Sequence, residues 1–91
     1  MADIRMTWPM YQRREIRVDG KTITLSPNQT EIVACLMIRR GYFTDWHDVA
    51  WFIWQGEGEP ERAHMSIGVL IDRIRRKGVP IGGSLVKGLR I

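Results

Sequence analysis

The side chains best suited to chemistry in this sequence lie on one face of a segment between residues 61 and 77. They recur at steps of four, three, four and three, a spacing that places side chains on a single helical face. These positions are Arg62, Ser66, Val69, Arg73 and Arg76. An arginine donates two hydrogen bonds to the O6 and N7 acceptors of guanine, and a valine contacts a thymine methyl group. The spacing therefore predicts base contacts in duplex DNA from Ser66, Val69, Arg73 and Arg76.

The same segment also carries a face on which it can pack. Its aliphatic side chains recur at helical spacing and form a second stripe, made of Ile67, Leu70, Ile71 and Ile74. A helix with one apolar and one basic face lies on a core and presents its cations outward. Asp72 is expected to pair with Arg75 or Arg76 along this helix. The alternative is a surface helix whose arginines are only solvated.

Basic side chains at the ends of this helix and near the end of the sequence suit the sugar-phosphate backbone. Contacts to phosphates orient a protein on DNA and make its affinity fall as the salt concentration rises, without reading the base sequence. The candidates for these contacts are Arg62, Arg75, Lys77, Lys87 and Arg90.

The length and the charge distribution of the chain limit the classes of protein to which it can belong. The chain has 91 residues, of which 44% are hydrophobic, enough for one small domain but not for a catalytic domain with a deep cleft. The formal net charge of +4 divides into +3 for residues 1–43, −4 for residues 44–60 and +5 for residues 61–91. A basic end beside an acidic middle segment predicts two different contact surfaces.

Groups that carry catalysis or bind metals are poorly represented. His47 and His64 lie on different expected helices, with neither a second cysteine nor a clustered carboxylate pair to complete a metal site. Ser66 and Ser84 have no histidine and acid at a recognisable spacing, and a serine without an activating base is a poor nucleophile. We therefore expect a binding module that is not an enzyme and uses no metal and no cofactor.

The single cysteine indicates in which cellular compartment the protein is found. Cys35 lies inside the apolar run 32–38, which indicates a buried thiol in a reducing environment. The run is far shorter than the about 20 residues that cross a bilayer, and the charges that follow Met1 are unlike a signal sequence. We expect a soluble, cytoplasmic protein without membrane contact.

The first half of the chain is predicted to form a sheet followed by a helix. Polar residues alternate with apolar ones on both sides of Asp19 and Gly20, the pattern of a hairpin with one buried face. Residues 1–12 precede it as an N-terminal arm or an edge strand, and the sequence leaves both open. Ser26 and Gln29 form a capping box around a proline, so a helix begins there and runs to about Arg40.

A second helix and a terminal hairpin complete the expected elements. Thr44 is expected to cap the helix, which ends near Gln55 and is apolar around most of its circumference. Part of its surface therefore needs a partner outside the core. The candidate protein interface consists of Trp51, Glu57 and Glu59. Residues 81–91 alternate apolar residues with glycines and predict a hairpin that turns at either Gly82–Gly83 or Lys87–Gly88.

The predicted fold is α+β, with an N-terminal antiparallel sheet, three helices and a C-terminal hairpin. Several short motifs occur in order along these elements. They are residues 13–20, then Leu25, Ser26, Pro27 and Gln29, then Ile53, Trp54 and Gly56, then Ile71, Arg73, Ile74, Arg75 and Lys77, and finally Gly88, Leu89, Arg90 and Ile91. In this order they resemble the DNA-binding effector domain of OmpR/PhoB-type response regulators. The resemblance covers residues 13–91.

The resemblance implies a winged helix-turn-helix whose third helix enters the major groove while the terminal hairpin, the wing, grips the adjacent backbone. It implies that the domain regulates transcription by sequence-specific binding to double-stranded DNA, and because the sequence shows no phosphoacceptor receiver domain we expect a standalone effector domain. A module of this size presents a small interface, so useful specificity needs a homodimer on DNA, tandem sites or a partner protein.

Two other functions compete with this one. The first is an adaptor that binds RNA polymerase or another protein through the aromatic second helix and the acidic loop after it. The second is an architectural protein that binds DNA without sequence preference.

Overall fold

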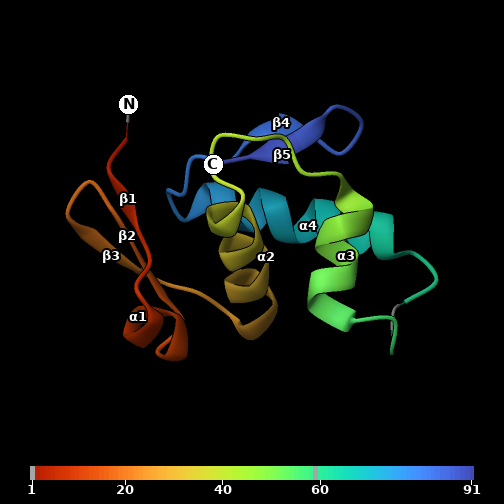
Figure 1. Ribbon diagram of the computed structural model, residues 1–91, viewed down its shortest axis with the longest axis horizontal. Helices are drawn as coiled ribbons and strands as arrows, with labels where there is room; N and C mark the ends of the chain where they lie inside the picture. The colour runs from red at the N-terminus through yellow and green to blue at the C-terminus, as the bar shows by residue number, and fades with distance from the viewer. Residues whose placement is uncertain (1, 59) are drawn as a thin grey trace.

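The computed structural model describes residues 2–58 and 60–91, and in this part of the chain it has four helices and five strands. The fold is mixed α+β, as predicted, with a three-stranded antiparallel sheet and a separate two-stranded hairpin. Figure 1 shows the sheet at one end of the molecule and the helices beside it. In chain order the elements are β1 (Ile4–Arg5), α1 (Trp8–Gln12), β2 (Glu15–Val18), β3 (Lys21–Thr24), α2 (Pro27–Ile38), α3 (Trp46–Trp54), α4 (Ala63–Arg76), β4 (Gly82–Ser84) and β5 (Gly88–Arg90).

The predicted hairpin forms β2 and β3. Its turn is made by Asp19 and Gly20, both with positive φ (49° and 83°), which is the geometry that matches the twist of the strands on either side. β1 adds to β2 as an edge strand, with Ile4 opposite Val18. Of the two alternatives predicted for the start of the chain, the structure therefore shows the edge strand. The short helix α1 that follows it was not predicted.

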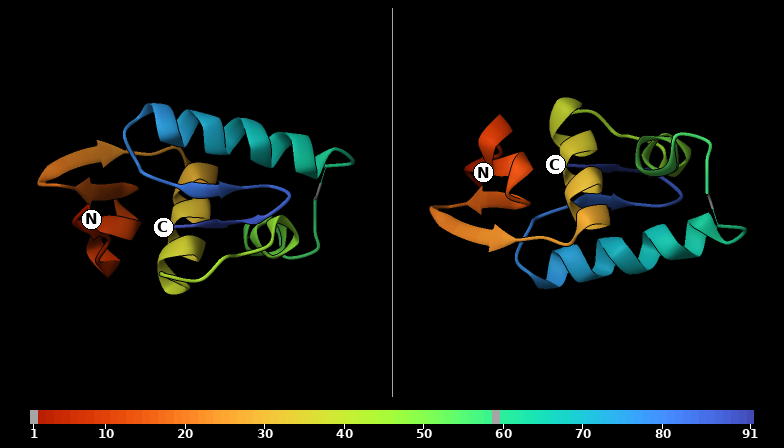
Figure 2. Two further views of the ribbon diagram at one scale, coloured as in Figure 1. Left: turned by 90° about the horizontal axis from the view of Figure 1, so that it is seen from above. Right: turned by 90° about the horizontal axis from the view of Figure 1, so that it is seen from below.

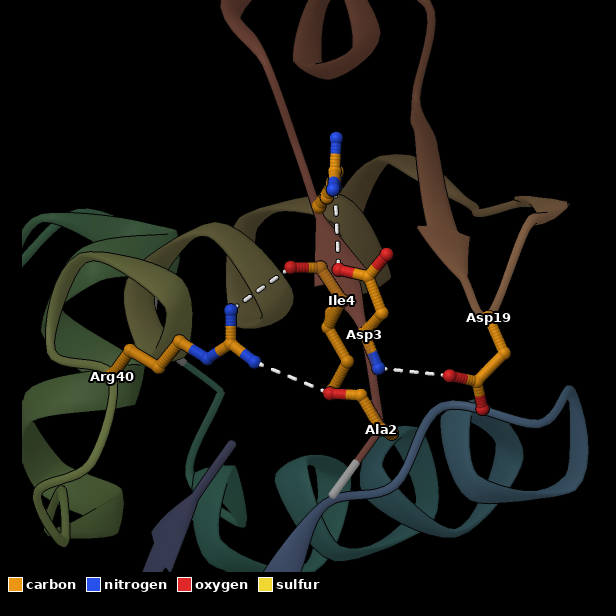
Figure 3. A network of polar contacts seen from close by, with 6 residues as sticks. Ala2, Asp3, Ile4, Asp19 and Arg40 are labelled. Carbon is orange, nitrogen blue, oxygen red and sulfur yellow. Dashed lines mark hydrogen bonds and ion pairs between the residues drawn. The ribbon is translucent and has the colours of Figure 1, made fainter.

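Arg40 fixes the edge strand to the end of α2. Its guanidinium donates to the carbonyl oxygens of Ile4 (2.9 Å) and Ala2 (3.5 Å), as Figure 3 shows. On the other side of the strand, the Asp3 amide donates to the Asp19 carboxylate at 2.8 Å. The start of the chain is thus held at both the helix and the turn.

α2 begins as predicted. The Ser26 hydroxyl accepts from the Gln29 amide while the Gln29 side chain accepts from the Ser26 amide, so both bonds of the capping box are present. The helix ends at Ile38 rather than near Arg40, and Gly41 (φ 89°) then redirects the chain.

The cap of α3 differs from the prediction. Asp45, not Thr44, is the N-cap, since its carboxylate accepts from the His47 amide at 2.8 Å. Thr44 is fully buried and pairs with Leu89 in an isolated antiparallel bridge. Thr44 is therefore used as an extended residue beside the terminal hairpin and is not available for capping.

The core lies between α2, α3 and α4, which pack against one another. Ile67, Ile71 and Ile74 of α4 are buried, as their spacing predicted, and Leu70 is half-buried at the edge of the stripe. α2 contributes Ile32, Val33 and Leu36, and α3 contributes Val49. Both views of Figure 2 place α4 along one edge of the molecule, with α1 and the carboxyl end of α2 toward the opposite edge.

Candidate nucleic-acid interface

The outward face of α4 carries the predicted base-reading side chains. Val69 and Arg73 are exposed and Ser66 is half-buried, while the isoleucines of the opposite stripe face the core. Within the described residues, Arg73 forms neither a hydrogen bond nor an ion pair. Its guanidinium is therefore available to an external acceptor.

Arg76 lies one turn further along and is paired. Its guanidinium is 3.0 Å from the Asp72 carboxylate, the pairing along the helix that the sequence predicted. Both side chains are largely exposed (77% and 58%), and ion pairs in such surroundings contribute only about 0–1 kcal/mol. A phosphate or a base edge can therefore replace Asp72 as the partner of Arg76 at small cost.

Two of the predicted phosphate contacts are occupied within the protein. Arg75 donates through Nε to the Ile81 carbonyl at 2.8 Å and through Nη2 to the Gly83 carbonyl at 2.9 Å. Lys77 donates through Nζ to the Thr24 carbonyl at 2.9 Å and to Gln29 Oε1 at 2.7 Å. These cations brace the end of α4 against the hairpin and against the start of α2, so the structure gives both of them a role that their spacing did not suggest.

The terminal hairpin lies directly beside α4. β4 pairs with β5, and residues 85–87 form the turn, so the chain does not turn at Gly82–Gly83, and of the other predicted pair Lys87 lies in the turn while Gly88 begins β5. A Cβ added to Gly68 would lie only 3.2 Å from a methyl group of Leu85, which means that the turn packs closely on the helix at that glycine. The Gly68 contact and the Arg75 bonds together fix the angle between hairpin and helix.

The remaining phosphate candidates are exposed. Arg62 is the N-cap residue of α4 and Lys87 lies in the hairpin turn. Arg90 is exposed on β5, and its guanidinium carbon lies 4.6 Å from the centre of the Phe43 ring, a cation–π contact. The structure thus places Lys87 in the turn that packs on α4 through Leu85, whereas Arg90 lies against Phe43, in the segment between α2 and α3.

The predicted protein interface lies elsewhere, on α3 and the loop after it. Trp51 is 62% exposed, and its ring lies against Gly56, where an added Cβ would come within 2.7 Å of a ring carbon. Glu57 is exposed in the same loop. Glu59, the third candidate, lies outside the described residues.

Titratable groups add little chemistry to either surface. Burial raises the pKa of the Cys35 thiol, and the hydrogen bond to Glu31 raises that of the Tyr11 hydroxyl. The His47 amide, donating to Asp45, lowers the pKa of that carboxyl. Among residues 2–58 and 60–91, no three of the histidine, cysteine, aspartate and glutamate side chains gather into a metal-binding group. No helix in this part of the chain is long and apolar enough to span a membrane.

No protein-family model and no curated protein matches the chain. The geometry of α4 and of the hairpin beside it is therefore what bears on function.

Proposed function

We propose that this protein binds duplex DNA as a winged helix, with α4 in the major groove and the β4–β5 hairpin on the adjacent backbone. The order of three helices followed by a hairpin supports this arrangement, as does the bridge that joins Thr44 to Leu89 and attaches the hairpin to the core. The resemblance to OmpR/PhoB-type effector domains in residues 13–91 points to the same fold and to transcriptional regulation.

One observation carries the proposal: the exposed side of α4 presents Arg73, which has no hydrogen bond or ion pair among residues 2–58 and 60–91, next to exposed Val69. The core side of the helix is held by buried isoleucines, so the fold sets the direction in which Arg73 leaves the helix. A guanidinium on a rigid helix is suited to bidentate bonding with guanine, which discriminates against other bases by about 1–3 kcal/mol. Arg76 joins it once Asp72 is displaced.

The other cations have distinct roles in this proposal. Arg62 and Lys87 contact phosphates at the two ends of the interface, and Arg90 supports the hairpin strand that faces the backbone. Arg75 and Lys77 contribute their charge to the local potential, while their bonded donors hold the hairpin and the helix in register.

Selection from a pool of random duplexes tests the proposal, with affinity for the enriched sequence then measured against salt concentration. We expect a common motif in the enriched duplexes and a steep fall of affinity as salt rises. Steep salt dependence without an enriched motif would identify an architectural DNA binder instead. If the protein shows no salt-dependent binding to any duplex, α4 has no nucleic-acid role.

A further inference from the structure

Asp72 is the one acidic residue in the sequence of α4, and it lies among the side chains of the exposed face. It follows Val69 by three positions and precedes Arg76 by four, so all three lie close together on the helix surface. The Asp72 side chain is 58% exposed, and its carboxylate is 3.0 Å from the Arg76 guanidinium. A carboxylate on a surface that approaches DNA is repelled by the phosphates, so its presence there needs a specific explanation.

Arg76 is the cation that pairs with Asp72, although Arg75 also lies within one turn of it. The Arg75 guanidinium donates to the carbonyl oxygens of Ile81 and Gly83, so it is turned toward the hairpin. Among residues 2–58 and 60–91, the Asp72 carboxylate has no ion pair or hydrogen bond besides the one to Arg76. Its surroundings in a complex therefore depend on where the Arg76 guanidinium turns.

Binding of α4 in the major groove would separate this pair. When the Arg76 guanidinium turns to a guanine, the Asp72 carboxylate loses its partner at a surface from which DNA excludes much of the water. A charge left unpaired at an interface costs more free energy than an exposed ion pair contributes. Asp72 then requires a hydrogen-bond donor from the DNA itself.

The major groove offers only two kinds of donor. They are the N6 amino group of adenine and the N4 amino group of cytosine, whereas the other polar groups on the base edges are acceptors. In adenine the acceptor N7 lies beside the amino group and repels a carboxylate, but cytosine has a C–H group at the corresponding place. A carboxylate therefore matches cytosine, while an amide, which both donates and accepts, matches adenine.

We propose, on the basis of the DNA-binding function proposed above, that Asp72 determines specificity by accepting a hydrogen bond from the N4 amino group of a cytosine. The guanine that Arg76 contacts lies within one base-pair step of this cytosine, because the two side chains meet in the free protein. The two bases replace the ion pair in the complex. The same carboxylate disfavours duplexes that present only acceptors at this position.

Selection from random duplexes tests this role with the natural full chain, Asp72→Asn and Asp72→Ala. We expect the natural chain to enrich a motif with a cytosine at one position, and Asp72→Asn to replace that cytosine by adenine. Asp72→Ala should lose the preference, with the discrimination between cytosine and the other bases falling at least about fivefold. Arg76→Ala should relax a preference for guanine within one step of the same position.

Asp48→Asn is the matched control, because it removes the same charge from a similar pair at the surface. The Asp48 carboxylate is 3.1 Å from the Arg39 guanidinium, and its side chain is 58% exposed, like that of Asp72. Asp48 lies on α3, outside the proposed interface, so this variant should enrich the same motif as the natural chain. The control separates base reading from the general gain in affinity for DNA when a negative charge is lost.

A modified base tests the same contact without relying on the variants alone. Replacing the cytosine of the motif by 2-pyrimidinone, which lacks the N4 amino group, also weakens the base pair. The loss of affinity should nevertheless be at least about fivefold larger for the natural chain than for Asp72→Ala, because only the natural chain has the acceptor. Equal losses for the two proteins would overturn the contact.

Failure of this role and failure of DNA binding give different results. If the natural chain enriches a motif and both Asp72 variants enrich the same motif, the role of Asp72 is overturned while base reading by α4 stands. A change at a position other than a cytosine overturns it equally. If the natural chain enriches no motif, sequence-specific binding fails, and the role of Asp72 fails with it.

Discussion

Three arginines in the last turn of α4 have three different surroundings. Arg73 has no partner in the described part of the chain, Arg76 is paired with Asp72 at the surface, and Arg75 is bonded to two carbonyl oxygens of the segment that enters the hairpin. Arg73 and Arg76 are thus available to an external ligand, whereas Arg75 stabilises the protein's own structure. Their effects on stability and on binding should separate accordingly.

Arg75→Ala should lower the free energy of unfolding by about 1–2 kcal/mol, because it removes hydrogen bonds from a charged donor. Arg73→Ala, two positions away on the same helix, should change it by less than about 0.5 kcal/mol, since the exposed side chain has no hydrogen bond or ion pair with the described residues to lose. Urea denaturation of the two variants measures both values. Equal destabilisation by the two substitutions would show that Arg75 does not brace the hairpin.

Cys35 should be unreactive in the folded protein. The thiol is buried and its pKa is raised, so at neutral pH it is protonated as well as inaccessible. Alkylation by iodoacetamide at pH 7.5 should be slow in buffer and fast in denaturant. Rapid alkylation of the native protein would mean that α2 opens readily at this position.

At the scale of the elements, the pairing of the terminal hairpin requires a glycine at position 83. Gly83 has φ 86°, and a Cβ there would lie 2.0 Å from the carbonyl oxygen of Gly88 on the paired strand. Gly83→Ala should therefore cost more than about 1 kcal/mol through backbone strain and should disrupt the β4–β5 pairing. Hydrogen exchange of the hairpin amides measures that loss.

Gly82→Ala is the control for this substitution, because the nearest atom to the added Cβ is 3.8 Å away and the backbone is not left-handed. It should leave the exchange of the hairpin amides close to that of the natural chain. Equal protection in the two variants would contradict the hairpin register described above.

The elements predicted well from the sequence are those with a local physical signal. The Asp19–Gly20 turn, the Ser26 capping box and the aliphatic stripe of α4 each depend on residues close together in the chain, and the structure has all three. α1 was missed because it is only five residues long and has no buried face. Its signal was Thr7 as N-cap with Pro9 behind it, and the Thr7 hydroxyl does accept from the Met10 amide.

The parts of the site that could not be predicted depend on contacts between distant segments. Helical spacing places Arg75 and Lys77 at the surface, but it cannot show that carbonyl oxygens of the hairpin and of β3 lie within reach. Thr44 was assigned to a cap for the same reason, since its pairing with Leu89 spans nearly half of the chain. Side chains bonded to remote backbone are therefore the main source of error in the predicted phosphate contacts.

The whole molecule presents two surfaces of opposite character on opposite sides. α4 and the hairpin turn expose cations, while α1, α2 and α3 enclose an apolar groove. A polyanion and a protein partner can occupy these surfaces at the same time, because neither covers the other.

The most direct test of the central claim compares Arg73→Ala with Lys87→Ala on two duplexes of equal length, one carrying the selected motif and one random, at a single salt concentration. We predict that Arg73→Ala reduces the ratio of the two affinities about tenfold or more, because it removes base reading. Lys87→Ala should weaken binding to both duplexes by a similar factor. Equal losses on both duplexes for both variants would contradict base recognition by α4.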